Sequence, residues 1–70
     1  MELPQTGVLA GFQSHKEAMK ALQGIAGVMD AQYSPVTMRY LYRRDSHSYS
    51  LYIIESVSRK GWWEIWVEVE

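Results

Sequence analysis

The apolar residues of the chain follow two different periods. Between residues 15 and 25 they recur at spacings of three and four, which predicts a helix with one buried stripe. That stripe consists of Ala18, Ala21, Leu22 and Ile25.

Polar and glycine residues mark the ends of this predicted helix. Ser14, followed three residues later by Glu17, has the form of a capping box and predicts where the helix starts. The helix is expected to end near residues 23–25, with Gly24 or Gly27 supplying the C-terminal stop.

After Pro35 the apolar residues alternate with polar ones, which predicts strands at 36–44, 49–58 and 62–69. Polar turns at 45–48 and 59–61 separate these strands, and Gly61 suits a turn position with positive φ. Residues 27–35 are predicted to be a loop. A shorter apolar run, Thr6 to Phe12, is predicted to be the first strand.

These elements predict a single α+β domain over residues 1–70, with residues 1–5 frayed at the N-terminus. Its order is β-α-β-β-β, with a four-stranded, largely antiparallel sheet and one helix packed on one face. The first strand is expected to join an edge of the three-stranded meander, and the pattern leaves open which edge.

The turn lengths predict how the strands pair. A three-residue loop at 59–61 pairs Ser58 with Trp62, and a four-residue loop at 45–48 pairs Arg44 with Tyr49. A register one residue away is rejected because it would place Glu55 opposite Glu64, and like charges directly opposed destabilise a sheet.

Both registers give the same two faces. The face toward the helix is predicted to carry Val36, Met38, Tyr40, Tyr42, Leu51, Ile53, Val57, Trp63, Ile65, Val67 and Val69. Glu55 is the one charged residue on that face, and it is expected either near the sheet end or as the acceptor of a hydrogen bond from a tyrosine.

The opposite face does not have the polar composition of a solvated sheet surface. Besides Glu70, it is predicted to carry a partner-binding set of Arg39, Leu41, Arg43, Tyr52, Ile54, Trp62, Glu64, Trp66 and Glu68. Apolar side chains would form a central strip with charges at the rim, which is typical of a protein interface. The alternative is that the stems of Arg39 and Arg43 fold over the aromatic rings and the face stays solvated.

Composition excludes several kinds of site. The 70 residues include no cysteine, which removes disulfides, thiolate metal sites and a cysteine nucleophile. His15 and His47 are too far apart in the sequence to suggest a metal centre, and no phosphate-binding glycine pattern is present. The run 45–48 (Asp-Ser-His-Ser) is expected to be a polar turn and not a catalytic triad. We therefore predict neither enzyme activity nor a cofactor.

Single-stranded nucleic acid is the alternative ligand. Arg39, Arg43 and Arg44 alternate with aromatic residues, and Tyr52 and Trp66 could stack on bases. Against this, 7 Lys and Arg are balanced by 8 Asp and Glu, and glutamates share the same face. The remaining basic residues could join the site only if the two hairpin tips converge.

One segment shows a family resemblance. The run 11–14 (Gly-Phe-Gln-Ser), followed by Glu17, Ala18 and Leu22, resembles the first strand–helix unit of SPOR peptidoglycan-binding domains. Those domains continue with a second helix where this chain is predicted to have three strands, so no function is carried over.

The sequence therefore predicts a non-catalytic interaction module, either a homodimer or a binder of a larger protein. In a homodimer, Arg39 and Arg43 of one chain would meet Glu64 and Glu68 of the other. Small domains of this kind often act as inhibitors or adaptors, as many phage-encoded proteins do, and this step is an analogy from size. The N-terminal residues lack the features of a signal peptide, so a cytoplasmic location is expected.

Overall fold

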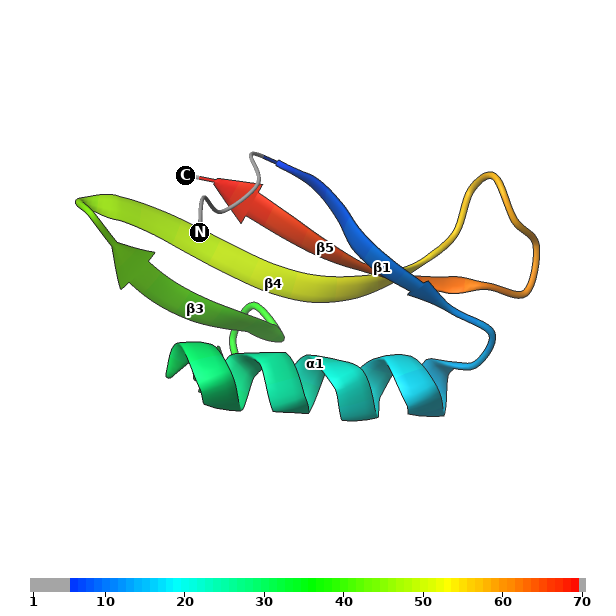
Figure 1. The fold of residues 1–70 in the computed structure, drawn as a ribbon, viewed down its shortest axis with the longest axis horizontal. Coiled ribbons are helices and arrows are strands. Elements are labelled where there is room, and N and C mark those ends of the chain that lie inside the picture. The colour runs from blue at the N-terminus through cyan, green and yellow to red at the C-terminus, as the bar shows by residue number, and fades with distance from the viewer. Residues whose placement is uncertain (1–5, 70) are drawn as a thin grey trace.

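The computed structural model describes residues 6–69 (Figure 1); the predicted fraying of residues 1–5 lies outside the described residues. Its elements are β1 (Gly7–Phe12), α1 (His15–Met29), β2 (Gln32–Ser34), β3 (Arg39–Arg44), β4 (His47–Glu55) and β5 (Trp63–Val69). The strands form one antiparallel sheet in the order β1-β5-β4-β3-β2, and α1 lies against one face of it. The predicted α+β class is confirmed, with five strands instead of four.

Helix α1 starts where its capping residue predicts. The Oγ atom of Ser14 accepts a hydrogen bond from the backbone N–H of Glu17 at 3.1 Å, so one of the unpaired N–H groups of the first turn is satisfied. Ala18 and Leu22 are buried, as predicted, and Ala26 continues the same stripe one turn further on.

The predicted end of the helix is wrong. Helix α1 runs through Gly24 and Gly27 to Met29, and the left-handed residue that ends it is Asp30, with φ 56°. The backbone N–H of Asp30 donates to the carbonyls of Ala26 and Gly27. Aspartate tolerates this conformation better than most residues, which makes a glycine unnecessary at the stop.

Strand β1 joins the sheet beside β5, which settles the edge that the sequence left open. Gly7 pairs with Val67 and Phe12 with Trp63, and the register shifts between Val8 and Ala10. This bulge bends an edge strand that carries no charge of its own.

Strand β2 was predicted to be part of a loop, and this prediction is wrong. Its three residues pair with β3, and the rings of Tyr33 and Tyr40 meet edge to face with centroids 5.2 Å apart. A turn over 35–38 joins the two strands, and Met38, its last residue, has a positive φ of 58°. The predicted burial of Val36 and Met38 is therefore also wrong, because both are in the turn and are 92% and 73% exposed.

Both predicted registers are wrong by two residues. Arg44 pairs with His47, so only Asp45 and Ser46 form the turn between β3 and β4. Both turn residues have positive φ, 51° and 68°, as in the tight hairpin turns that match the twist of a sheet. The sequence prediction missed this turn because it lacks the glycine or asparagine that usually marks it.

The loop between β4 and β5 is longer than predicted. Strand β4 ends at Glu55, which is exposed and pairs with Trp63, so the sheet-end alternative for Glu55 is correct. Ser56 orders the loop, since its Oγ atom accepts a hydrogen bond from the backbone N–H of Arg59 at 3.0 Å. Val57, predicted to be in the core, is 96% exposed in this loop, and Gly61 has the expected positive φ of 84°.

The predicted assignment of β3, β4 and β5 residues to the two faces is still correct, because each register differs from the prediction by an even number of residues. The buried core between the sheet and α1 consists of Leu22, Tyr42, Leu51, Ile65 and Val67. Trp63 is half-buried on this side, and its ring meets His15 edge to face with centroids 4.7 Å apart.

Tyr42 is the one described residue whose pKa clearly departs from its ordinary value. The residue is 8% exposed, and its ring stacks on that of Tyr49 with centroids 4.9 Å apart. Burial raises its pKa above 10.0, Tyr49 raises it further, and the positive charge of Arg44 opposes the shift.

Candidate functional site: the open sheet face

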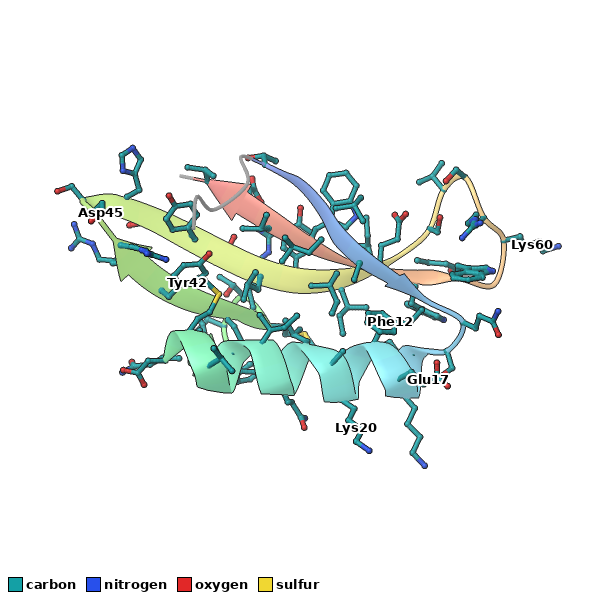
Figure 2. The ribbon with its side chains drawn as sticks, viewed as in Figure 1. Phe12, Glu17, Lys20, Tyr42, Asp45 and Lys60 are labelled. Carbon is teal, nitrogen blue, oxygen red and sulfur yellow. The ribbon has the colours of Figure 1, made fainter. Side chains whose placement is uncertain are left out.

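The side of the sheet opposite α1 is called the open face. In Figure 2, Phe12 and Tyr42 lie between sheet and helix, while Lys20 points away from the sheet. Within residues 6–69, no helix covers the other side. Strand alternation places there Val8, Gly11, Gln32, Ser34, Arg39, Leu41, Arg43, Ser48, Ser50, Tyr52, Ile54, Glu64, Trp66 and Glu68.

Three large side chains form a row across the middle of the open face. Val8 of β1 pairs with Trp66 of β5, and Trp66 pairs with Tyr52 of β4, so the three lie side by side. Val8 is 47% exposed, whereas Trp66 and Tyr52 are half-buried. We call these three residues the aromatic row, after the two rings of Trp66 and Tyr52.

Arg39 continues the row onto β3. Its guanidinium carbon lies 4.0 Å from the centre of the Tyr52 ring, in cation–π geometry. The same guanidinium crosses β4 and forms an ion pair with Glu68 of β5, with Nη1 and Oε2 2.6 Å apart. It also covers Ser50, which is fully buried, with Nη1 and Oγ 3.5 Å apart.

A second polar contact fixes the tryptophan of the row. The indole N–H of Trp66 donates to Oε1 of Glu64, two residues earlier on the same strand, at 3.3 Å. The polar edge of the ring is therefore satisfied within the chain, and the residue is half-buried.

The row has apolar neighbours on both sides. Leu41, which pairs with Ser50, is 40% exposed, and Ile54, which pairs with Glu64, is half-buried. Arg43 pairs with Ser48 and is exposed. Apolar side chains of the open face thus come from β1, β5, β4 and β3, and the guanidinium of Arg39 lies among them, over Tyr52 and Ser50.

Eight of the nine predicted site residues lie on the strands of this face, and their binding role stays a prediction. Arg39 was expected at the rim of the face. Its guanidinium instead lies over Tyr52 and Ser50. Trp62 precedes β5 and lies in the loop, 4.4 Å from the guanidinium carbon of Arg59. Glu70 lies outside the described residues.

The sequence prediction left out six members of the face, and two of them, Val8 and Ser50, take part in the contacts described above. Val8 could not be placed because the edge joined by β1 was open. Ser50 is a small residue between apolar ones on β4, and that size difference is the signal that a long side chain from a neighbouring strand lies over it.

The basic residues outside the open face do not gather. Arg44 and His47 lie at the turn between β3 and β4, while Arg59 and Lys60 lie in the loop beyond the other end of β4. The hairpin tips therefore do not converge, which was the condition for adding their charges to a nucleic-acid site.

The other candidate groups have structural contacts. His15 packs against Trp63, and Nδ1 of His47 is 2.9 Å from the backbone carbonyl oxygen of Asp45. In the described part of the chain, no group of three or more His, Asp or Glu residues could hold a metal ion. No helix over residues 6–69 is long and apolar enough to cross a membrane.

Comparison with known proteins found no match. No family model, curated protein or solved structure matches the chain.

Proposed function

We propose that this protein is a non-catalytic interaction module that binds a protein surface through its open face. The observation that carries the proposal is the aromatic row, Val8, Trp66 and Tyr52, which lies on the side of the sheet that α1 leaves uncovered. A contiguous apolar surface with polar neighbours is typical of protein-binding sites.

The contacts within the face support binding because they give its long side chains partners within the chain. Arg39 is fixed by Tyr52 and Glu68, and Trp66 is fixed by Glu64. Ordering long side chains on association costs about 0.5–1.5 kcal/mol each. Side chains that are already ordered in the free protein avoid part of that cost.

Charge favours a protein over single-stranded nucleic acid as the ligand. Glu64 and Glu68 lie on the same face as Tyr52 and Trp66, where they would repel phosphates. Arg39 is already paired with Glu68, so its charge is partly neutralised within the chain. The proposed site of action is the cytoplasm.

Position-specific photo-crosslinking in the cells that produce the protein tests this proposal. A photo-reactive phenylalanine analogue replaces Leu41 or Val8 on the open face, and the controls carry it at Lys20 or Lys16, which are exposed on α1. We expect one discrete protein adduct from the open-face positions and none from the controls. Mass spectrometry identifies the adduct as a second copy or another protein.

A disruptive variant makes the test specific. Trp66→Glu introduces a charge into the aromatic row, and we expect it to abolish the adduct formed from position 41. Circular dichroism checks that the variant folds, and Leu41→Glu, with crosslinking from position 8, provides a second disruption at a more exposed site. An adduct that survives both substitutions, or no adduct from the open face, contradicts the proposal.

A further inference from the structure

Charges on the open face are segregated by strand. Arg39 and Arg43 lie on β3, whereas Glu64 and Glu68 lie on β5. Strand β4 lies between them, and its open-face residues, Ser48, Ser50, Tyr52 and Ile54, are uncharged. The face therefore has a basic side and an acidic side, separated by a neutral strand.

We propose that the partner of the open face is a second copy of this chain, related by a two-fold axis that runs along β4. This inference rests on the proposed function and names its partner. Rotation about such an axis places β3 of one copy over β5 of the other, so basic and acidic sides meet twice. An axis perpendicular to the strands would instead place β3 over β3 and β5 over β5, which brings like charges together.

The strand registers specify which side chains meet. Arg39 lies one position beyond the Tyr40–Leu51 pair, level with Tyr52, and Trp66 pairs with Tyr52. Across the axis, Arg39 of one copy therefore faces Trp66 of the other. Glu64 and Glu68 flank Trp66 on its own strand face, so the strand position of Arg39 lies opposite a ring with a carboxylate on each side, while the guanidinium itself lies over Tyr52 beside the axis.

Arg43, which forms no ion pair within residues 6–69, gains an acidic neighbour across the axis. It is level with Ser48, and Glu68 is level with Ser50, which is the next position on the same face of β4. Across the axis, Arg43 of one copy thus lies one side-chain step from Glu68 of the other, about 7 Å along the strands.

The area of the face reaches the lower limit for a specific interface. Five strands spaced about 4.8 Å apart, each about six residues long, give a flat area of about 480 Å² per copy. Two copies packed face to face would bury about 1,000 Å², the size at which specific interfaces begin. Aligned packing of two twisted sheets, with strands within about 30° of each other, is a common arrangement.

Cross-linking through a single thiol tests the axis directly, because the chain has no cysteine of its own. Ile54 lies on β4, so the proposed axis brings position 54 of the two copies together, whereas a perpendicular axis through the centre of the face would separate them. We expect Ile54→Cys to form a covalent dimer with a short bismaleimide. Lys20→Cys, exposed on α1 and pointing away from the sheet, is the control and should remain monomeric.

Charge reversal at two adjacent residues tests the pairing of strands. Arg43 lies on the open face and Arg44 alternates to the other side, so Arg43→Glu and Arg44→Glu change the net charge equally on opposite faces. Sedimentation equilibrium should give twice the chain mass of 8.1 kDa for the natural chain. We expect Arg43→Glu to weaken the dimer about tenfold or more, and Arg44→Glu to leave it unchanged.

The outcomes separate this inference from the proposed function. A strictly monomeric protein whose open face crosslinks to a different protein overturns the second copy and leaves the proposed function standing. A dimer that Trp66→Glu dissociates but that Arg43→Glu and Arg44→Glu affect equally overturns the axis alone. A dimer that is indifferent to Trp66→Glu and Leu41→Glu overturns both.

Discussion

Arg39 and Glu68 are joined across an intervening strand. Arg39 is on β3 and Glu68 is on β5, yet Nη1 and Oε2 are 2.6 Å apart because the guanidinium passes over Ser50 of β4. A serine at that position leaves room that a larger side chain would fill. The ion pair therefore depends on the small size of the residue beneath it.

Arg39→Ala is expected to destabilise the fold by about 1 kcal/mol, because it removes a partly exposed ion pair and a cation–π contact, each contributing about 0.5–1 kcal/mol at most. Urea unfolding monitored by circular dichroism measures the change. Arg39→Lys is the matched control, since it keeps the charge but loses the planar group over Tyr52. Its free energy of unfolding should lie between those of Arg39→Ala and the natural chain. Equal stability of Arg39→Ala and the natural chain would contradict the structural role of this contact.

The turn between β3 and β4 offers a stabilising substitution. Ser46 has φ 68°, a conformation that costs most non-glycine residues about 1 kcal/mol or more. Ser46→Gly should therefore stabilise the fold by about 0.5–1 kcal/mol, after allowing for the greater freedom of glycine in the unfolded chain. Ser48→Gly, two residues later in extended β4, is the control and should be destabilising. Thermal unfolding of the two variants gives opposite shifts if the turn is as described.

The same turn explains why the sequence predicted the faces but not the pairing. Alternation of apolar residues on β3, β4 and β5 places Tyr42, Leu51 and Ile65 toward the helix in either register. The pairing depends instead on turn length, and Asp45 and Ser46 lack the asparagine or glycine that would indicate a two-residue turn. Alternation with a period of two therefore cannot distinguish registers that differ by two residues.

The candidate site divides in the same way. Which side chains share the open face was predictable, because Leu41, Tyr52 and Trp66 interrupt a pattern that solvent exposure would make polar. The contact of Arg39 with Glu68 was not predictable, because it needs the observed register and the small size of Ser50. Short strand β2 was missed because its three residues follow no period and are held by their partner β3.

The glycines of α1 provide a third prediction. Gly24 and Gly27 were expected to stop the helix but lie inside it, and a Cβ atom added at either position would contact nothing within 4 Å. Glycine within a helix costs about 0.5–1 kcal/mol relative to alanine, so Gly24→Ala and Gly27→Ala should each stabilise the fold by about that amount.

Gly61→Ala is the control for these helix substitutions. Gly61 has φ 84°, so alanine there is strained even though the space around it is open. Urea midpoints should rise for the two helix variants and fall for Gly61→Ala. A decrease for Gly24→Ala would mean that the helix does not continue past that residue.

The last prediction concerns the response of stability to alkaline pH. Burial raises the pKa of Tyr42 in the folded protein above 10.0, and the neighbouring Tyr49 adds to the shift. The unfolded chain therefore releases this proton at lower pH than the folded chain does. Stability linked to Tyr42 is fully present below pH 10 and is lost as the pH rises through the folded pKa.

Tyr42→Phe has no phenol to ionise, so its free energy of unfolding should fall less steeply above pH 10 than that of the natural chain. Urea unfolding at several alkaline pH values measures both slopes, and Tyr33→Phe is the matched control for loss of a phenol that is 50% exposed. Parallel slopes for Tyr42→Phe and the natural chain would show that the phenol of Tyr42 ionises equally easily in the folded and unfolded states.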